Sequence, residues 1–335
     1  MLFEFDPDQR LWQRTVREAV SKECTPALVR SVSDDGIDPA PLWRTYGKLG
    51  WTEFTDPSDA VELGIVLEEL GHAVDPTPYL ATMTQFAPLA PAAAGDGQCG
   101  TAVFTGVDAS RAEGAVTLTG TGRYVLDGDR AERFAVVTGE GVFVVPADRV
   151  TVTPLPVFDP LLHVAEVTFD GVRVGEDARS TADPERAHHL ALAGLAMTMV
   201  GACRRILDLT LEHVRGRRQF DAPIGSFQAV QHKAADMHVA IERARALAYF
   251  AMMTIAADDP RRHLAAAMAK ASAGECQALV FRHGVQLFGA MGSTWENDLQ
   301  FALKRAKAGE LLLGGAAEHR ARIADIVRDG HATDL

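Results

Sequence analysis

Apolar residues recur at helical spacing through most of the first 90 residues. The segments Leu11–Arg30 and Pro41–Gly50 show this pattern, and Val61–Val74 shows it most strongly, with Pro76 just beyond it. Apolar positions three and four residues apart predict amphipathic helices, and proline marks where such a helix stops. We therefore expect residues 1–90 to form an N-terminal helical domain.

The period changes between about residues 101 and 175. β-Branched residues alternate with polar ones there, and Gly/Asp turn signals recur every 8 to 12 residues. This alternation predicts short antiparallel strands, with one hairpin turn at Asp170–Gly171. The segment Pro88–Gly100 is rich in Pro, Ala and Gly and is predicted to be a linker. Residues 91–178 are thus expected to form a small antiparallel β domain.

Long helical patterns fill the remainder of the chain, residues 179–335. Pro184–Val214, Ser226–Ala257 and Arg261–Met291 are rich in alanine and leucine at period 3.6, with short Gly or Pro punctuation between them. Short connections between long helices predict an antiparallel four-helix bundle. Because strands and helices do not alternate along the chain, the fold class is expected to be α+β rather than parallel α/β.

Composition narrows the possible functions. The 335 residues are 47% hydrophobic and carry a formal net charge of −12, which argues against nucleic acid as the main partner. The N-terminus has no apolar signal region, and no run of 18 uncharged apolar residues predicts a membrane span. The cysteines are widely separated and form no CxxC pair, so no structural metal or disulfide framework is expected and a cytoplasmic location is predicted: Cys24, Cys99, Cys203 and Cys276.

One apparent motif is misleading. The run from Gly95 to Gly100 matches GxGxxG, the fingerprint of dinucleotide-binding folds. That fingerprint works only between a strand and the N-terminus of a helix. A Pro/Ala-rich segment precedes this run and a predicted strand follows it, so we interpret it as a loop.

A cluster of cations follows the first long helix. Arg215, Arg217 and Arg218 lie within four positions, and a Pro/Gly turn then leads to Ser226, which is placed to cap the next helix. Guanidinium groups bind phosphate oxygens in bidentate fashion, so the cluster suits a diphosphate. Cations that complement the dipole of a helix C-terminus explain the same pattern. The residues alone leave both interpretations open.

Two further runs lie near residue 290. Gln286–Gly292 holds small residues that would let a ligand approach the backbone, although glycines that end a helix explain them equally well. Ser293 and Glu296 have the spacing of a capping box, so we expect Glu296 to cap a helix beginning there rather than to act in catalysis.

The run R-x-Q-F-x-x-P-I-G-x-F-Q-A-V-Q-H resembles the flavin-binding signature of the acyl-CoA dehydrogenase family. The resemblance implies that Arg217, Gln219 and Phe220 meet the diphosphate of FAD across a dimer interface. The stretch that begins at Phe227, with Gln228 and Val230, matches the next flavin-contacting segment.

A second resemblance follows in the same order and spacing. Gln286, Leu287, Gly289, Ala290 and Gly292 resemble the family's Q-x-x-G-G-x-G, which lies against the ADP part of FAD, with Ala290 as a departure. The run after it resembles the family's T-W-E-x-D, and VLEELGHAVDPTPYL resembles its N-terminal helix. The resemblance covers almost the whole chain and implies the same order of domains.

The chain departs from the family where catalysis requires an acid. Family members remove the α-proton with a Glu at one of two positions, which here read Leu313 or Gly314, and Ala191. The β zone also lacks the family's T-E-P-x-x-G-S-D segment, and Tyr124–Leu126 replaces its W-x-T/S motif. The catalytic residues are therefore predicted to be none.

The simplest hypothesis is a division of labour. Some family members that degrade steroid side chains resemble α2β2 heterotetramers, and this chain matches the subunit that lends the diphosphate grip to a catalytic partner. A second hypothesis is a self-sufficient homo-oligomer that uses another acid, such as Glu310 or Asp298. A third is a non-catalytic scaffold of the same fold without flavin. The resemblance implies an acyl-CoA substrate and an electron-transfer flavoprotein as acceptor.

Overall fold

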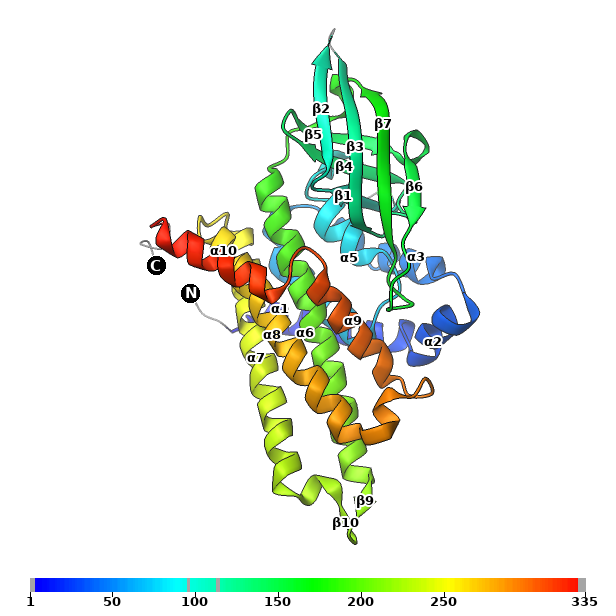
Figure 1. Cartoon of the computed structure of the whole chain (residues 1–335), viewed down its shortest axis with the longest axis vertical. Helices are drawn as coiled ribbons and strands as arrows, with labels where there is room; N and C mark the ends of the chain where they lie inside the picture. Colours follow the sequence, from blue (N-terminus) through cyan, green and yellow to red (C-terminus); the bar gives the residue numbers. More distant parts are fainter. Residues whose placement is uncertain (1–3, 95–96, 113–114, 331–335) are drawn as a thin grey trace. The chain divides into compact units, whose positions relative to one another are not determined.

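The computed structural model describes residues 4–94, 97–112 and 115–330 and is drawn in Figure 1. The chain divides into two compact units, each assembled from separate stretches of sequence. Unit 1 comprises Met1–Gly36, Val61–Asp75 and Leu192–Leu335, and unit 2 comprises Ile37–Ala60 and Pro76–Ala191. The domain limits of the sequence analysis remain predictions.

Unit 1 is helical and contains the predicted bundle of long helices. Two short helices and one apolar helix come from the N-terminal part of the chain: α1 (Pro7–Glu23), α2 (Pro26–Asp35) and α4 (Ala60–Ala73). The bundle follows, with α6 belonging to unit 1 from Leu192 onward and its first turns, up to Ala191, belonging to unit 2: α6 (Pro184–Gly216), α7 (Gln228–Ala256), α8 (Arg262–Phe288), α9 (Leu299–Leu311) and α10 (Ala316–Arg328). The order of N-terminal helices, β-sheets and C-terminal bundle confirms the predicted α+β fold class.

The predicted helix Leu11–Arg30 is wrong as a single element, because the chain breaks between α1 and α2. Pro26 has no N–H to continue the helical ladder, so α1 ends before it. The Thr25 hydroxyl then accepts a hydrogen bond from the Leu28 N–H at 3.2 Å and caps α2.

Unit 2 holds the β-strands together with α3 (Ala40–Lys48) and α5 (Tyr79–Ala81). One four-stranded sheet has the order β1-β4-β5-β8, with strands Gly100–Val103, Arg133–Thr138, Gly141–Pro146 and Arg179–Ser180. The other has the order β2-β3-β7-β6, with strands Val107–Ala112, Ala115–Leu126, Val164–Val174 and Thr151–Pro154. Buried side chains from both sheets, such as Phe134, Phe143 and Phe169, form one apolar core.

Two details of the β prediction are wrong. The sheets are not purely antiparallel, because β1 pairs parallel with β4. The expected hairpin at Asp170–Gly171 is a β-bulge, since β7 runs straight through these residues. They lie opposite only Thr119 of β3, and the φ of 63° at Gly171 accommodates the extra residue.

The first half of the predicted linker Pro88–Gly100 is part of the core. Leu89 and Ala90 are buried and belong to an apolar cluster with Phe86. A short 3-10 turn, η4 (Pro91–Ala93), follows. Alanine and leucine favour burial wherever a neighbouring surface is available, so composition alone misassigned this segment.

Within unit 1, glycines allow α4 and α6 to approach closely. A Cβ at Gly71 would lie 2.3 Å from the Thr198 carbonyl oxygen, and a Cβ at Gly201 would lie 2.1 Å from the Glu68 carbonyl oxygen. Any larger residue at either glycine would push the two backbones apart.

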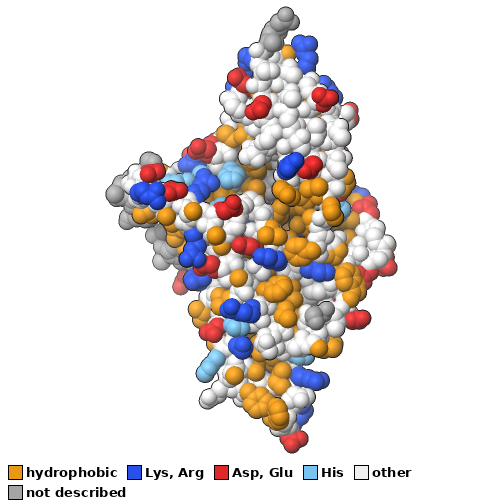
Figure 2. Space-filling view, in the orientation of Figure 1, with side chains coloured by type: hydrophobic (Ala, Val, Ile, Leu, Met, Phe, Trp, Pro, Cys, Tyr) orange, Lys and Arg blue, Asp and Glu red, His pale blue; other side chains and the backbone are white. Residues whose placement is uncertain are grey.

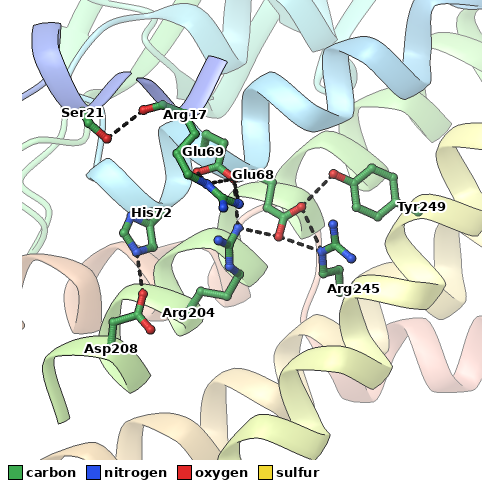
Figure 3. A network of polar contacts seen from close by, with 9 residues as sticks. All are labelled: Arg17, Ser21, Glu68, Glu69, His72, Arg204, Asp208, Arg245 and Tyr249. Atoms are coloured by element: carbon green, nitrogen blue, oxygen red, sulfur yellow. Dashed lines mark hydrogen bonds and ion pairs between the residues drawn. The ribbon is translucent and has the colours of Figure 1, made fainter. Parts of the chain in front are cut away.

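The same interface buries a carboxylate. Glu68 of α4 is fully buried and accepts hydrogen bonds from Arg204 Nη1 at 2.7 Å, Arg245 Nε at 2.9 Å and the Tyr249 hydroxyl at 2.7 Å (Figure 3). Burial alone would raise the pKa of this carboxyl, but the two guanidinium groups and the hydrogen bonds outweigh it and lower that pKa. Glu68 therefore links α4 to α6 and α7 as a charged group.

Among the described residues, α6 is long and apolar enough to cross a membrane by length and composition. However, 89% of its apolar window is buried inside the structure. Such burial is typical of a core helix of a bundle.

Candidate cofactor-binding site

The arginine cluster forms a hairpin at the end of α6. Arg218–Gln219 (β9) pairs antiparallel with Ala222–Pro223 (β10), and the two residues between them, Phe220 and Asp221, have φ of 53° and 60°. Positive φ at both central residues is typical of a type I′ turn. The Arg218 Nη2 donates to the Asp221 carbonyl at 2.6 Å and closes the turn. The hairpin is thus held by its own backbone and by Arg218.

Two of the predicted FAD-binding residues on this hairpin have side chains available for a ligand. Arg217 and Gln219 are both exposed, and their side chains make no hydrogen bond or ion pair with any residue that the structure describes. The Arg217 backbone is fixed by a bond from its N–H to the His213 carbonyl at 2.8 Å. A fixed backbone with unused guanidinium and amide donors suits an anionic ligand.

Aromatic side chains surround these donors. Phe220 is 89% exposed, although a bulky residue at positive φ is strained, and its ring meets Phe227 edge-on at 6.2 Å. Figure 2 shows hydrophobic and cationic side chains together at this end of the bundle. Backbone strain of this kind clusters at binding and active sites, which makes Phe220 a candidate binding residue.

The N-terminus of α7 lies beside this turn and has no side-chain cap. The prediction that Ser226 caps the helix is wrong, because its hydroxyl donates to the Pro223 carbonyl at 2.7 Å and the helix begins at Gln228. Gln228 is exposed and Val230 is partly buried in the first turn. An uncapped helix N-terminus offers backbone N–H groups to an anion.

The second motif is the end of α8 and the 3-10 turn η8 (Gly289–Ser293) that follows. Gly289 adopts φ 63° and ψ −144°, and its N–H donates to the Gln286 carbonyl. A Cβ at Gly292 would lie 2.9 Å from the Phe288 Cβ, so the turn depends on glycine there. Gln286 and Ala290 are exposed, whereas Leu287 is buried.

The structure brings the two motifs together. The His213 ring of α6 stacks on the Phe288 ring of α8, with centroids 4.4 Å apart and planes at 15°. Burial and the nearby Arg217 charge lower the pKa of His213 and so favour the neutral form of this ring. Arg217 and Gly289 therefore lie at the same end of the bundle, close to one aromatic contact that the sequence analysis did not foresee.

Neither predicted base position carries an acid. Ala191 is a buried residue of α6, and Leu313 and Gly314 follow α9 with φ of 53° and 90°. Of the alternative acids, Asp298 is bound by Arg30 at 2.6 Å. The Glu310 Oε1 accepts from the Ala316 N–H at 2.9 Å, and its buried Oε2 has no partner among the described residues.

Lys270 was missed by the sequence analysis. It is fully buried in α8, and its Nζ donates to the Gly314 carbonyl at 2.5 Å and the Glu310 carbonyl at 3.2 Å. Burial lowers the pKa of this amine to about 8. Its signal in the sequence was a single lysine inside an apolar, alanine-rich run.

The remaining motifs are structural. The prediction that Glu296 caps a helix is wrong, because α9 begins at Leu299, whose N–H donates to Asn297 Oδ1 at 2.9 Å. The Ser293 side chain lies outside the described residues.

Tyr124 is 69% exposed at an irregularity of β3 with φ 55°. Of the GxGxxG run, residues 95–96 lie outside the described residues, and β1 follows at Gly100. Among the described residues no cluster could hold a metal ion.

Comparison with known proteins identifies close relatives. Residues 183–327 match the family description "Acyl-CoA dehydrogenase, C-terminal domain". The chain is 33% identical over 323 residues to acyl-CoA dehydrogenase IpdE2 of Mycobacterium tuberculosis, covering 93% of this chain and 95% of that protein. It is 31% identical to IpdE2 of Mycolicibacterium smegmatis, covering 94% and 97%.

Solved structures agree. A chain in the crystal structure of the ChsE4–ChsE5 complex from Mycobacterium tuberculosis superposes with a TM-score of 0.88 at 25% identity, covering 98% of this chain and 99% of that one. Butyryl-CoA dehydrogenase from Megasphaera elsdenii superposes with a TM-score of 0.86 at 19% identity, covering 98% and 100%.

Proposed function

The chain belongs to the acyl-CoA dehydrogenase family. We propose that it is the subunit of a heteromeric dehydrogenase that binds the ADP part of FAD and supplies no catalytic base. The observation that carries the proposal is a contrast between two sites. Arg217 and Gln219 present unused donors for a diphosphate, whereas the base position after α9 holds Leu313 and Gly314. A relative in a two-protein complex, ChsE4–ChsE5, supports a heteromer.

The residues present fit the ADP part of FAD. Arg217 would form charge-assisted hydrogen bonds with the diphosphate, and Gln219 and Gln286 would add neutral ones. The glycines at Gly289 and Gly292 would let the adenosine part approach the backbone. Bound FAD supplies the acceptor for the β-hydrogen of an acyl-CoA, and the partner subunit supplies the base for the α-proton. An electron-transfer flavoprotein is the proposed acceptor of the electrons.

The first experiment compares the visible flavin absorbance of this chain purified alone with that of the chain co-purified with a candidate catalytic subunit, an acyl-CoA dehydrogenase that carries the glutamate base. We expect flavin and acyl-CoA turnover in the complex only. In the complex, Arg217→Met should weaken FAD binding about tenfold or more, because a charge-assisted hydrogen bond contributes roughly 1.5–3 kcal/mol. Arg215→Met is the matched control, since Arg215 is likewise exposed at the end of α6 and makes no hydrogen bond or ion pair with any described residue. Equal losses in both variants would contradict the proposed role of Arg217.

A self-sufficient homo-oligomer is the second candidate. Asp298 is already bound by Arg30, so Glu310 is the acid that this reading requires, and its Oε2 is the oxygen without a partner. Stoichiometric flavin and turnover in the lone chain, lost in Glu310→Gln, would support it. A colourless complex that turns over nothing would instead favour the non-catalytic scaffold. The four free cysteines support the proposal of a cytoplasmic location.

A further inference from the structure

A pocket of about 370 Å³ lies within unit 1 and is lined by none of the cofactor-motif residues. Its walls come from α1, α2, α4, α6 and the start of α9. Figure 3 shows its polar side, where residues of α1, α4 and α6 point toward one another. This volume falls within the range of small-molecule sites.

The carboxylates that line this pocket already have partners. Glu69 accepts from Arg17 Nη2 at 2.8 Å and from Arg204 Nη1 at 3.2 Å. Asp208 lies 2.9 Å from His72 Nε2 (Figure 3). The third, Asp298, is bound by Arg30 at 2.6 Å. None of the three needs a further cation to satisfy it.

The cations of the pocket are not used up in the same way. Arg205 is half-buried and makes no hydrogen bond or ion pair with any described residue. Its charge acts on Asp208 only through space, as one of the minor causes that lower the pKa of that carboxyl behind the His72 hydrogen bond. Arg204 uses only Nη1 in the bonds of this network. Unused guanidinium donors beside satisfied carboxylates can receive an anion.

The rest of the pocket is apolar. Val20, Cys24 and Val29 are each at most 3% exposed and form its floor, and Phe301 closes one side. We propose that this pocket binds a small monocarboxylate with a compact apolar body, with Arg205 holding the carboxylate and the floor holding the body. The lining holds three arginines and three acids, a balance that does not favour an anion of higher charge such as phosphate.

Calorimetric titration of the 335-residue chain with benzoate tests the proposal. Benzyl alcohol, which lacks the charge, and inorganic phosphate, which lacks the apolar body, are titrated in parallel at fixed ionic strength. We expect saturable binding of benzoate alone. Arg205→Met should raise its Kd about tenfold or more, because a charge-assisted hydrogen bond is lost. The Kd of Arg205→Lys for benzoate should lie between those of the original chain and Arg205→Met, since lysine keeps the charge without the bidentate geometry.

The matched control is Arg44→Met, which removes an exposed arginine of α3 that likewise has no ion pair among the described residues. Its Kd for benzoate should stay within about twofold of the original. An unchanged unfolding temperature without ligand shows that each variant is folded. Benzoate binding that is absent, that survives Arg205→Met, or that phosphate matches would overturn the proposal. None of these outcomes depends on flavin, so the proposed function is tested separately.

Discussion

Replacing the buried carboxylate of Glu68 by an amide tests how the helices of unit 1 are held together. Glu68→Gln keeps the shape of the side chain but removes the charge that faces Arg204 and Arg245 (Figure 3). The amide oxygen at the position of Oε1 can still accept from Arg204 and Arg245. The NH₂ group at the position of Oε2 can donate to the Tyr249 hydroxyl but also lies against Arg245 Nε, which has no acceptor.

The expected loss of stability depends on which ion pairs each arginine retains in Glu68→Gln. Arg204 retains Glu69 at 3.2 Å, whereas Arg245 of α7 has no second ion pair among the described residues. Removing one partner of a buried pair costs about 3–5 kcal/mol, and the retained bond at Arg204 places this variant near the lower end, at about 3 kcal/mol. Glu69→Gln is the matched control. Of its two partners, Arg17 has a half-exposed side chain and Arg204 keeps Glu68, so the loss there should be about 1 kcal/mol.

Urea unfolding, followed by far-UV circular dichroism, gives the free energy of unfolding of both variants. The two values can be compared if the m-values are equal. The pH dependence gives a second test. The pKa of Glu68 in the folded chain is lowered below its ordinary value of 4.5. The stability that its charged form contributes is therefore complete above pH 4.5 and is lost as the pH falls through the folded pKa. The difference between the original chain and Glu68→Gln should shrink in that range. Equal losses in the two variants, or a pH-independent difference, would refute the reasoning.

Three further predictions follow from single contacts. Gly201→Ala should cost about 1–3 kcal/mol by urea unfolding, because its Cβ would lie 2.1 Å from the Glu68 carbonyl oxygen; Gly216→Ala, with nothing within 4 Å, should be nearly neutral. Lys270 has a pKa of about 8 in the folded chain against 10.5 in the unfolded chain. Between these values only the unfolded chain holds the proton, so the free energy of unfolding rises with pH, by about 3 kcal/mol. Lys270→Met should flatten that rise in unfolding midpoints measured over a pH series. Phe220→Asn should raise the unfolding temperature, because asparagine relieves about 1 kcal/mol of strain at φ 53°, yet lower flavin retention in the co-purified complex; a variant that retains flavin fully would exclude Phe220 from the site.

The fold was largely predictable because its main signals are local and repeated. Period 3.6 over 27 to 33 residues predicts α6 and α8 without knowledge of their neighbours. The errors lie where a distant partner decides the local structure. Asp170–Gly171 has the composition of a hairpin turn, but β3 pairs with the strand on both sides of it and makes it a bulge. Likewise, the Ser226 hydroxyl donates to the Pro223 carbonyl and accepts no hydrogen bond from the N–H groups of the helix that it was expected to cap.

The candidate site was predictable to a similar degree. The exposed donors Arg217 and Gln219 lie within one continuous motif, so sequence spacing located them. The stacking of His213 on Phe288 joins residues 75 positions apart, and only tertiary structure brings them together. Lys270 was visible as a polar residue in an apolar run, but its acceptors are 40 and 44 residues away, so its role could not be read from the sequence.

The contacts that hold the loop after α9 are separate from those that hold the hairpin carrying Arg217. Leu313 keeps a φ of 53°, which leucine rarely adopts, because its carbonyl is bound by His319 at 2.8 Å and the next carbonyl is bound by Lys270. The loop after α9 is therefore held by contacts that do not involve the side chain at position 313, so an acid there can be replaced without unfolding the loop. The hairpin that carries Arg217 is held by its own turn and by the His213 carbonyl. Under the proposed function, the absence of an acid after α9 therefore need not affect the binding of flavin at the hairpin.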